Sequence, residues 1–485
     1  MVSKIPRILR HLVIAASAAG IAFTVAVAIR AQEITDVFPS EEYVARRAAL
    51  MGTIGDGVAI IQGTIERPGE QHFRQGNQFC YLFGPINQPR IIAVLDGKSK
   101  RTTFYLNRDR AERAYGVKSL GPDEASAKQA GVDAIEPRDS FAGAVLQFAA
   151  DKRTIFTPFR PEVLGEASAS DASGQANATK RDPWDGRQSR EEAFIAKLKS
   201  AAPESTIKDL DPLLDRMRGT KSAREIEVMR EATMVAGLGI MEAMRDVRPG
   251  MYEYEVQADA DFVYKRFGSY GPSFNALIMA GPNSLFSNYH KNTAKIQDGD
   301  FVEIDYSPDY KGYSSDITRI FPANGKFTPV QREAYTVYLR IYQALLTSIQ
   351  VHMAPRDIIK AAVLKMDTIL GAYKFTNPNV KTAATTFVER YRNSRANSLG
   401  HTVGMEVHDV RNPTETLEPG QIFTIEPQMN VPEEHFGIRL EDILLITESG
   451  CENLSAFVPI EIAEVAKLMK DPGLSDAALK RPIKR

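Results

Sequence analysis

Acidic side chains inside apolar, strand-like segments constrain this chain more than any other feature of its sequence. Residues 301–306 and 317–321 have the composition of two strands, and a turn around Lys311 joins them into a predicted hairpin. Asp305 lies near the end of the first strand and Asp316 precedes the second, so the hairpin brings two carboxylates together. Facing carboxylates repel each other unless one is protonated or a cation lies between them. The alternative is that both aspartates lie at solvated strand ends and need no cation.

Three further ionisable residues, His401, Glu426 and Glu441, lie in mostly apolar runs later in the chain. An unpaired carboxylate among branched apolar side chains is costly. A single histidine in such surroundings is more often a core residue with a hydrogen-bond partner than a metal ligand. Arg439 could also offset Glu441 without a metal, because residues two apart share one face of a strand. Together, however, the four carboxylates and His401 favour one common cation site.

Composition limits the kind of site that these residues can form. The 485 residues include only two cysteines, too few for a disulfide framework, a Cys-rich zinc module or an iron–sulfur cluster. We expect Cys80 and Cys451 to be free, buried thiols. Lys and Arg total 60 against 61 Asp and Glu, so net charge gives no reason to expect a nucleic-acid partner. Any metal must be held by nitrogen and oxygen.

Four motifs surround the candidate ligands: Asp305 with Asp316-Ile317-Thr318-Arg319, Gly400-His401 with Val407-His408-Asp409, Thr424-Ile425-Glu426-Pro427, and Gly437-Ile438-Arg439-Leu440-Glu441-Asp442. In order and spacing they resemble the pita-bread metallopeptidases, specifically the aminopeptidase P and prolidase branch. Residues 73–84 resemble a motif of the creatinase-like domain that precedes the catalytic domain in that branch. Methionine aminopeptidases share the ligands but lack this domain, so they match less well.

The resemblance implies an α+β protein, in which a creatinase-like α/β N-terminal domain precedes a pita-bread catalytic domain. It implies two divalent metal ions. Asp305 would bind one ion, His401 and Glu426 the other, and Asp316 and Glu441 would bridge both. Manganese is the usual metal of the family, although Co²⁺ or Zn²⁺ would also suit these ligands. Such a pair can hold a bridging hydroxide and polarise a scissile carbonyl.

The resemblance also assigns roles on the substrate side of the site. Glu426 resembles the family's proton shuttle, His290 and His408 its substrate-binding histidines, and Arg439 the arginine beside the last ligand. We therefore expect a metallo-exopeptidase that removes an N-terminal residue from peptides with proline in second position. A prolidase acting on Xaa-Pro dipeptides is the alternative, and a non-peptidase creatinase-like protein is a weaker one. Because dimers are common in the family, we expect a homo-oligomer.

Three departures from the family pattern affect the substrate pocket. Asn397 replaces a histidine that commonly lies four residues before the ligand histidine. Asn430 takes the place of a tyrosine after the Glu-Pro pair, and residues 306–308 replace a small, Gly-containing turn. The metal ligands are retained, so we expect looser selectivity for proline rather than loss of activity.

The first 31 residues are predicted to be a signal peptide. Lys4, Arg7 and Arg10 precede an apolar run over residues 12–29, and Ala31 is a small residue suited to cleavage. The mature chain would then begin near Gln32, outside the cytoplasm. The run is long enough that an uncleaved membrane anchor is the alternative.

Beyond this segment we predict a creatinase-like domain over residues 32–210, a catalytic domain over 211–472 and a basic tail over 473–485. In the first domain, the pattern predicts strands at 57–61, 91–95, 102–106 and 154–156, helices at 109–115 and 141–149, and a solvated loop without chemistry at 164–179. In the second, it predicts helices at 224–241, 254–267, 331–351 and 355–370, and single strands at 422–427 and 438–446.

Overall fold

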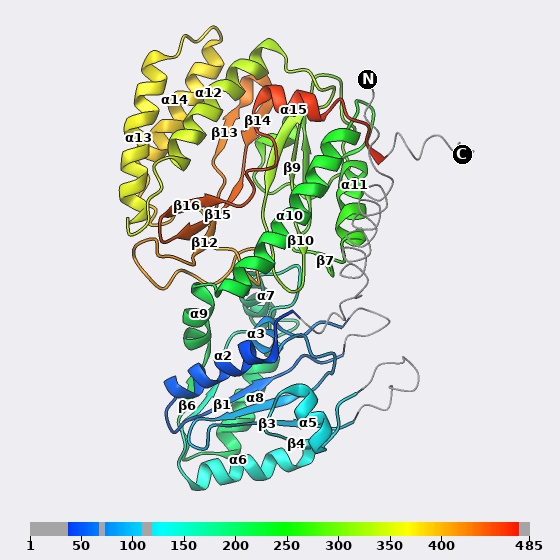
Figure 1. Cartoon of the computed structure of the whole chain (residues 1–485), viewed down its shortest axis with the longest axis vertical. Helices are drawn as coiled ribbons and strands as arrows, with labels where there is room; N and C mark the ends of the chain where they lie inside the picture. The colour runs from blue at the N-terminus through cyan, green and yellow to red at the C-terminus, as the bar shows by residue number, and fades with distance from the viewer. Residues whose placement is uncertain (1–36, 67–72, 109–118, 475–485) are drawn as a thin grey trace, which may run out of the picture.

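The computed structural model describes residues 37–66, 73–108 and 119–474. Two units of mixed helix and strand lie one above the other, the N-terminal unit below in blue and cyan (Figure 1). The predicted N-terminal signal, the helix at 109–115 and the residues of the tail beyond 474 lie outside the described residues. The predicted domain limits stay predictions.

A six-stranded sheet forms the N-terminal unit, in the order β4-β3-β2-β1-β5-β6. Its strands are β1 (Val58–Gln62), β2 (Ile92–Asp96), β3 (Arg101–Leu106), β4 (Ala134–Pro137), β5 (Ile155–Thr157) and β6 (Ile207–Asp209). Successive side chains of β1 point to opposite faces of the sheet and so pack into two hydrophobic cores. Val58 and Ile60 pack on one face, and Ala59 and Ile61 pack on the other. The four predicted strands are confirmed as β1, β2, β3 and β5.

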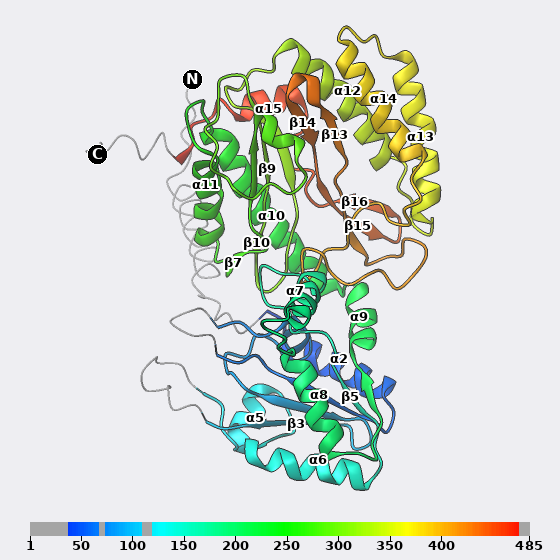
Figure 2. The ribbon, with the colours of Figure 1, turned by 180° about the vertical axis from the view of Figure 1, so that it is seen from behind.

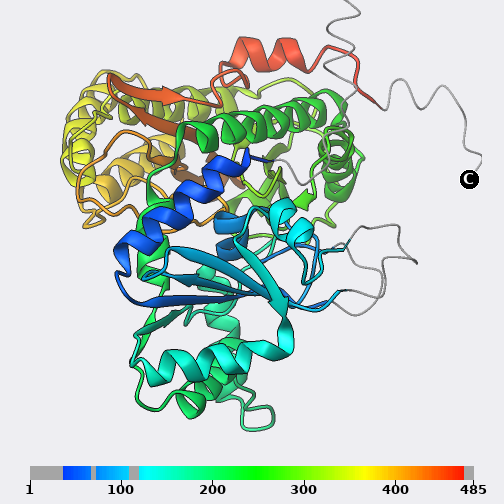
Figure 3. The same cartoon turned by 60° about the horizontal axis from the view of Figure 1, so that its bottom comes forward.

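Helices cover both faces of this sheet. Side chains of α6 (Phe141–Ala150) and α8 (Arg190–Ala201) pack on one face. On the other lie α2 (Ser40–Thr53), α3 (Asn77–Phe83) and α5 (Glu124–Ala130). The blue helix α2 therefore lies between the sheet and the green helix α10 of the second unit (Figure 3). Helix α6 confirms the helix predicted at 141–149.

The second unit contains several small antiparallel sheets that carry the candidate ligands. One sheet has the order β11-β9-β8, another β12-β15-β16, and β13-β14 and β10-β7 form two pairs. The strands are β7 (Gly271–Pro272), β8 (Leu277–Ala280), β9 (Phe301–Asp305), β10 (Pro308–Asp309), β11 (Thr318–Pro322), β12 (Ile422–Ile425), β13 (Gln428–Val431), β14 (Phe436–Arg439), β15 (Asp442–Thr447) and β16 (Gly450–Asn453). The predicted hairpin is confirmed, because β9 and β11 pair antiparallel.

Helices flank these sheets on two sides (Figure 1, and from behind in Figure 2). On one side lie α10 (Ala223–Asp246) and α11 (Glu253–Arg266), and on the other α12 (Pro329–Leu346), α13 (Pro355–Ala372) and α14 (Pro378–Arg392). Helix α9 (Asp211–Gly219) follows the N-terminal sheet, and α15 (Ile462–Leu468) lies near the end of the described chain. The helices predicted for this unit are confirmed, whereas α9, α14 and α15 were not predicted. Within the described residues, no helix has the length and apolar character of a membrane span.

Two sequence predictions were wrong. Residues 164–179 are not a loop throughout, because α7 (Ala169–Arg181) occupies most of them. The Ser168 hydroxyl caps this helix and Asp171 completes a capping box, while the small polar residues that suggested a loop keep its surface solvated. Residues 438–446 form two strands in different sheets, because the chain turns between Arg439 and Asp442.

Candidate metal centre

Strand pairing brings the predicted ligands together from distant parts of the sequence. Asp305 ends β9 opposite Thr318 of β11, and Asp316 lies two residues before that threonine. Glu426 follows β12, and Glu441 lies in the turn between β14 and β15. The backbone N–H of Glu441 donates to the carbonyl of Thr318, which joins the two ligand-bearing sheets.

The geometry of the cluster centres on the imidazole of His401. Its Nε2 atom lies 3.3 Å from Glu426 Oε1, 3.4 Å from Asp316 Oδ2 and 3.8 Å from Glu441 Oε1. Asp316, His401 and Glu441 each offer a ligand atom, and these atoms lie within 4.8 Å of one another. Asp305 joins them from β9 with its Oδ2 2.7 Å from Nη2 of Arg439.

The donor atoms fit divalent cations. Asp305 Oδ1, Asp316 Oδ1 and Glu441 Oε1 are buried and have no hydrogen-bond partner within the described part of the chain. Burial, together with repulsion from neighbouring carboxylates, raises the pKa of Asp305 and of Glu441 well above the usual range. Such oxygens are costly to bury without a cation, and carboxylates with one imidazole suit Mn²⁺, Co²⁺ or Zn²⁺.

The pKa of His401 shows that its surroundings are strongly negative. Burial opposes its protonation, but contacts with Asp316 and Glu426 prevail and raise the pKa of His401 to about 10. The contact with His401, and the charge of Arg439, hold the pKa of Glu426 below its usual range despite burial. A concentrated positive charge is therefore favoured at the point where these side chains converge.

The two predicted substrate histidines have different surroundings. His408 lies beside the cluster, with its ring centroid 4.4 Å from that of His401 and the ring planes at 86°. Burial and the neighbouring His401 lower the pKa of His408. His290 is exposed, and its Nδ1 lies 3.2 Å from the carbonyl oxygen of Asn275. Its role in substrate binding stays a prediction.

Arg439 is held between two acids of β9, one of which sequence reasoning missed. Its Nε lies 3.2 Å from Glu303 Oε1, and its Nη1 donates to the Ser287 carbonyl at 3.3 Å. Glu303 is completely buried, and burial raises its pKa to about 7. The alternation of β9 could have revealed it, because Glu303 and Asp305 share one face.

The cluster opens onto a cavity of about 850 Å³ that both units line. His401, His408 and Asn397 line it from the second unit, and Ala169 and Ser170, at the start of α7, line it from the first. The Ala169 N–H donates to Glu406 Oε2 at 2.7 Å, which fixes the start of α7 beside the segment that contains His401 and His408. The segment predicted to lack chemistry therefore forms part of the cavity wall.

The other two departures from the family pattern, Asn430 and residues 306–308, make contacts within the fold. The Asn430 side chain donates to the Leu285 carbonyl at 3.2 Å and accepts from Gln428 at 3.0 Å. The Tyr306 ring is buried, and its hydroxyl donates to Asp261 at 2.5 Å.

Cys80 and Cys451 are free, as predicted, and half-buried.

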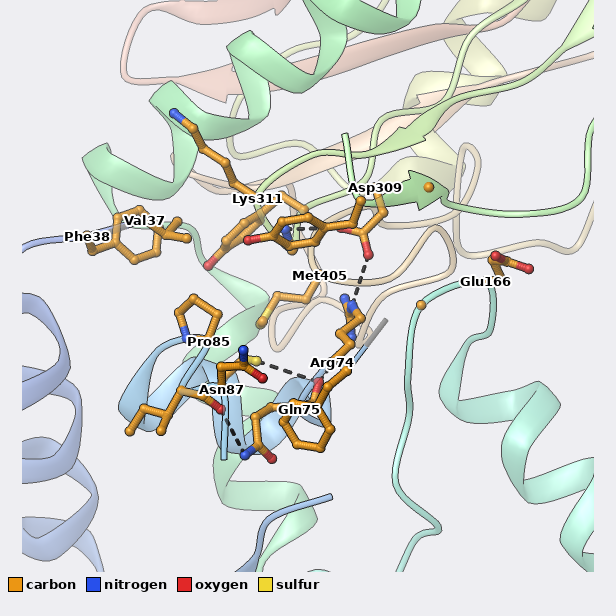
Figure 4. A pocket seen from close by; sticks show the side chains of 18 of the residues that line it. Val37, Phe38, Arg74, Gln75, Pro85, Asn87, Glu166, Asp309, Lys311 and Met405 are labelled. Atoms are coloured by element: carbon orange, nitrogen blue, oxygen red, sulfur yellow. Dashed lines mark hydrogen bonds and ion pairs between the residues drawn. The ribbon is translucent and has the colours of Figure 1, made fainter. Parts of the chain in front are cut away.

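A second cavity, of about 420 Å³, lies between the two units and contains none of the five ligands. Figure 4 shows the Arg74 guanidinium and the Asp309 carboxylate in direct contact in the wall of this cavity. Their atoms Nε and Oδ2 are 2.9 Å apart, and Arg74 also donates to Asn77 at 2.7 Å. The contact between Arg74 and Asp309 joins the N-terminal unit to the β9–β11 hairpin.

The fold and the carboxylate-rich cluster together define a metallohydrolase with an additional N-terminal domain. Comparison with known families matches residues 227–448 to metallopeptidase family M24 and residues 43–156 to the aminopeptidase P N-terminal domain. The chain belongs to metallopeptidase family M24, and the resemblance found in its sequence is confirmed.

Similar proteins and structures support this assignment. A Xaa-Pro aminopeptidase of Escherichia coli is 30% identical, over 88% of this chain and 97% of the relative. A Xaa-Pro dipeptidase of Pyrococcus horikoshii is also 30% identical, but over 54% of this chain and 70% of the relative. The structure of E. coli aminopeptidase P with the inhibitor Pro-Leu is 27% identical with a TM-score of 0.69, covering 92% of this chain and all of that one.

Proposed function

We propose that this hydrolase is a Xaa-Pro aminopeptidase, which removes an N-terminal residue that precedes proline. The observation that carries the proposal is the convergence of buried, unpartnered carboxylate oxygens around His401. The E. coli relative supports it, because its similarity extends over both units of the chain.

We assign the two divalent ions, Mn²⁺ in the first instance, to Asp305, Asp316, His401, Glu426 and Glu441; bound there, they would polarise the scissile carbonyl and activate water. Glu426 accepts a proton from the attacking water and delivers it to the leaving amine. His408, at the cavity wall, donates an N–H to the oxygen of the tetrahedral intermediate. Arg439 orients Asp305 from behind, and His290 contacts the peptide.

The test compares the same protein before and after metal removal. We expect chelation to abolish cleavage of a tripeptide with proline in second position and Mn²⁺ to restore it, with weak cleavage of a matched alanine peptide. Turnover that is indifferent to chelation would contradict the proposal, and purified protein without any first-row metal would favour the non-peptidase reading.

A prolidase is the second candidate, supported by the match to the P. horikoshii dipeptidase, which covers 54% of this chain and 70% of that relative. Product analysis with a dipeptide and a tripeptide of the same first two residues separates the two activities. An aminopeptidase cleaves the tripeptide, whereas a strict prolidase cleaves only the dipeptide.

We also propose that the chain is exported and acts as a homo-oligomer. The charged start, the apolar run and Ala31 support export, with membrane tethering as the alternative if the segment is not cleaved. Cell fractionation with N-terminal sequencing tests this, and a full-length soluble cytoplasmic protein would contradict it. Light scattering of the purified protein tests the oligomer.

A further inference from the structure

Glu303 is a buried acid at a position where the sheet offers it only apolar neighbours. Across the sheet it lies opposite Met279 of β8 and Ile320 of β11. Its side chain is 0% exposed, and neither of its oxygens has a hydrogen-bond partner in good geometry among the described residues. A carboxylate in such surroundings is costly, whereas an apolar side chain of similar size would pack there readily. Its presence therefore needs a reason.

The group that faces Glu303 is the guanidinium of Arg439. Nε of Arg439 lies 3.2 Å from Glu303 Oε1, while Nη2 lies 2.7 Å from Oδ2 of Asp305. The arginine thus contacts both acids of one strand face, and its planar head is fixed at two edges. One contact holds a candidate metal ligand, and the other holds an acid with no other ionic partner in the described chain.

Charge explains why this second contact matters. The ligands Asp305, Asp316, Glu426 and Glu441 together provide four negative charges, which two divalent cations would balance. An unopposed Arg439 would cancel one of them and would compete with a cation for Asp305, because like charges repel strongly in a buried site. An acid paired with the opposite edge of the guanidinium removes this effect.

We infer that Glu303 is a positioning residue of the metal centre: it fixes Arg439 and neutralises its charge, so that Asp305 and its neighbours keep their full charge for divalent cations. The inference rests on the proposed dinuclear centre but not on the peptide that the enzyme cleaves. Glu303 acts through Arg439 and does not touch the substrate.

The experiment is a calorimetric titration of the metal-stripped full-length chain with Mn²⁺ at about pH 8, where the Glu303 carboxyl group is ionised. It requires no substrate. Glu303→Gln keeps the shape of the side chain and removes its charge, and we expect at least a tenfold increase in the Kd of the weaker Mn²⁺ step. Glu303→Met replaces the acid with an apolar side chain like that of its neighbour Met279, and we expect the same increase in Kd. Glu303→Asp keeps the charge, and we expect it to stay within about threefold of the wild type.

The matched control is Glu225→Gln. Glu225 is also a buried acid that contacts an arginine, with its Oε2 3.3 Å from Nη2 of Arg46, and it lies outside the metal cluster. We expect its Mn²⁺ affinity to match the wild type. Wild-type affinity in folded Glu303→Gln or Glu303→Met would overturn the inference, as would equal weakening in the control or in Glu303→Asp. If Mn²⁺ binds as expected but no peptide is cleaved, the proposed substrate fails while this inference stands.

Discussion

Replacing Arg218 with methionine should strongly destabilise the protein, because this arginine contacts two buried acids at the junction of the units. Its Nη2 lies 2.7 Å from Glu406 Oε1 and also contacts Asp409, whose other oxygen is 3.0 Å from Nζ of Lys221. All four side chains are at most 2% exposed. Two cations balance two anions, so Arg218→Met leaves one buried carboxylate unpaired. Breaking a buried pair in this way costs about 3–5 kcal/mol of unfolding free energy.

The unfolding free energy lost in Arg218→Met should decrease as the pH falls. Although burial opposes it, Arg218 and Lys221 hold the pKa of Asp409 below its usual range. A carboxyl group with a lowered folded-state pKa stabilises the protein above its unfolded-state pKa, about 4. That contribution disappears as pH falls through the lowered folded-state value. The difference between wild type and Arg218→Met should therefore be largest at neutral pH and shrink below about pH 4.

Urea denaturation at pH 7 and at acidic pH measures this difference. The matched control is Arg216→Met, because Arg216 lies on the same helix, α9, and is exposed. We expect a change within about 0.5 kcal/mol for the control. A loss below about 1 kcal/mol for Arg218→Met at pH 7, or an equal loss in the control, would refute the reasoning about the buried charges.

Three predictions concern the proposed activity. Asp316→Ala and Glu441→Ala should abolish turnover and reduce bound metal, as measured by elemental analysis; full metal content in both would show that they are not ligands. His408→Ala should keep its metal and lower kcat by about 100- to 1000-fold, because it acts on the transition state, and a metal-free variant would mean that the wrong histidine was assigned. Asn397→His should raise the ratio of kcat/KM for proline over alanine peptides by about 10- to 100-fold, and an unchanged ratio would place Asn397 outside the pocket.

The convergence of acidic side chains around His401 could be predicted, because their positions among apolar, strand-like residues are visible in the sequence alone. Asp305 and Asp316 lie at the ends of strands that must pair, and Glu426 lies where apolar neighbours make a free carboxylate costly. The contact distances around His401 follow from tertiary pairing. The turn at Glu441 was missed because a run of apolar residues on both sides reads as one strand. Only the pairing of β14 with β13 and of β15 with β12 divides it.

Helix α7 shows where composition misleads. Small and polar residues over 164–179 are typical of solvated loops, but alanine is also the best helix former. The capping box between Ser168 and Asp171 was present in the sequence and would have indicated a helix start. Its contact with Glu406 could not be predicted, because it joins residues 237 positions apart.

The structure distinguishes between Asn430 and Asn397 as residues that could alter the selectivity for proline. Asn430 uses its amide within the fold, since Nδ2 donates to Leu285 and Oδ1 accepts from Gln428. An amide held on both sides in this way is not free to contact the substrate. Asn397, in contrast, is exposed and lines the same cavity as His401 and His408. Because it can donate and accept hydrogen bonds but cannot carry a charge, its effect should fall on the recognition of the peptide rather than on metal binding.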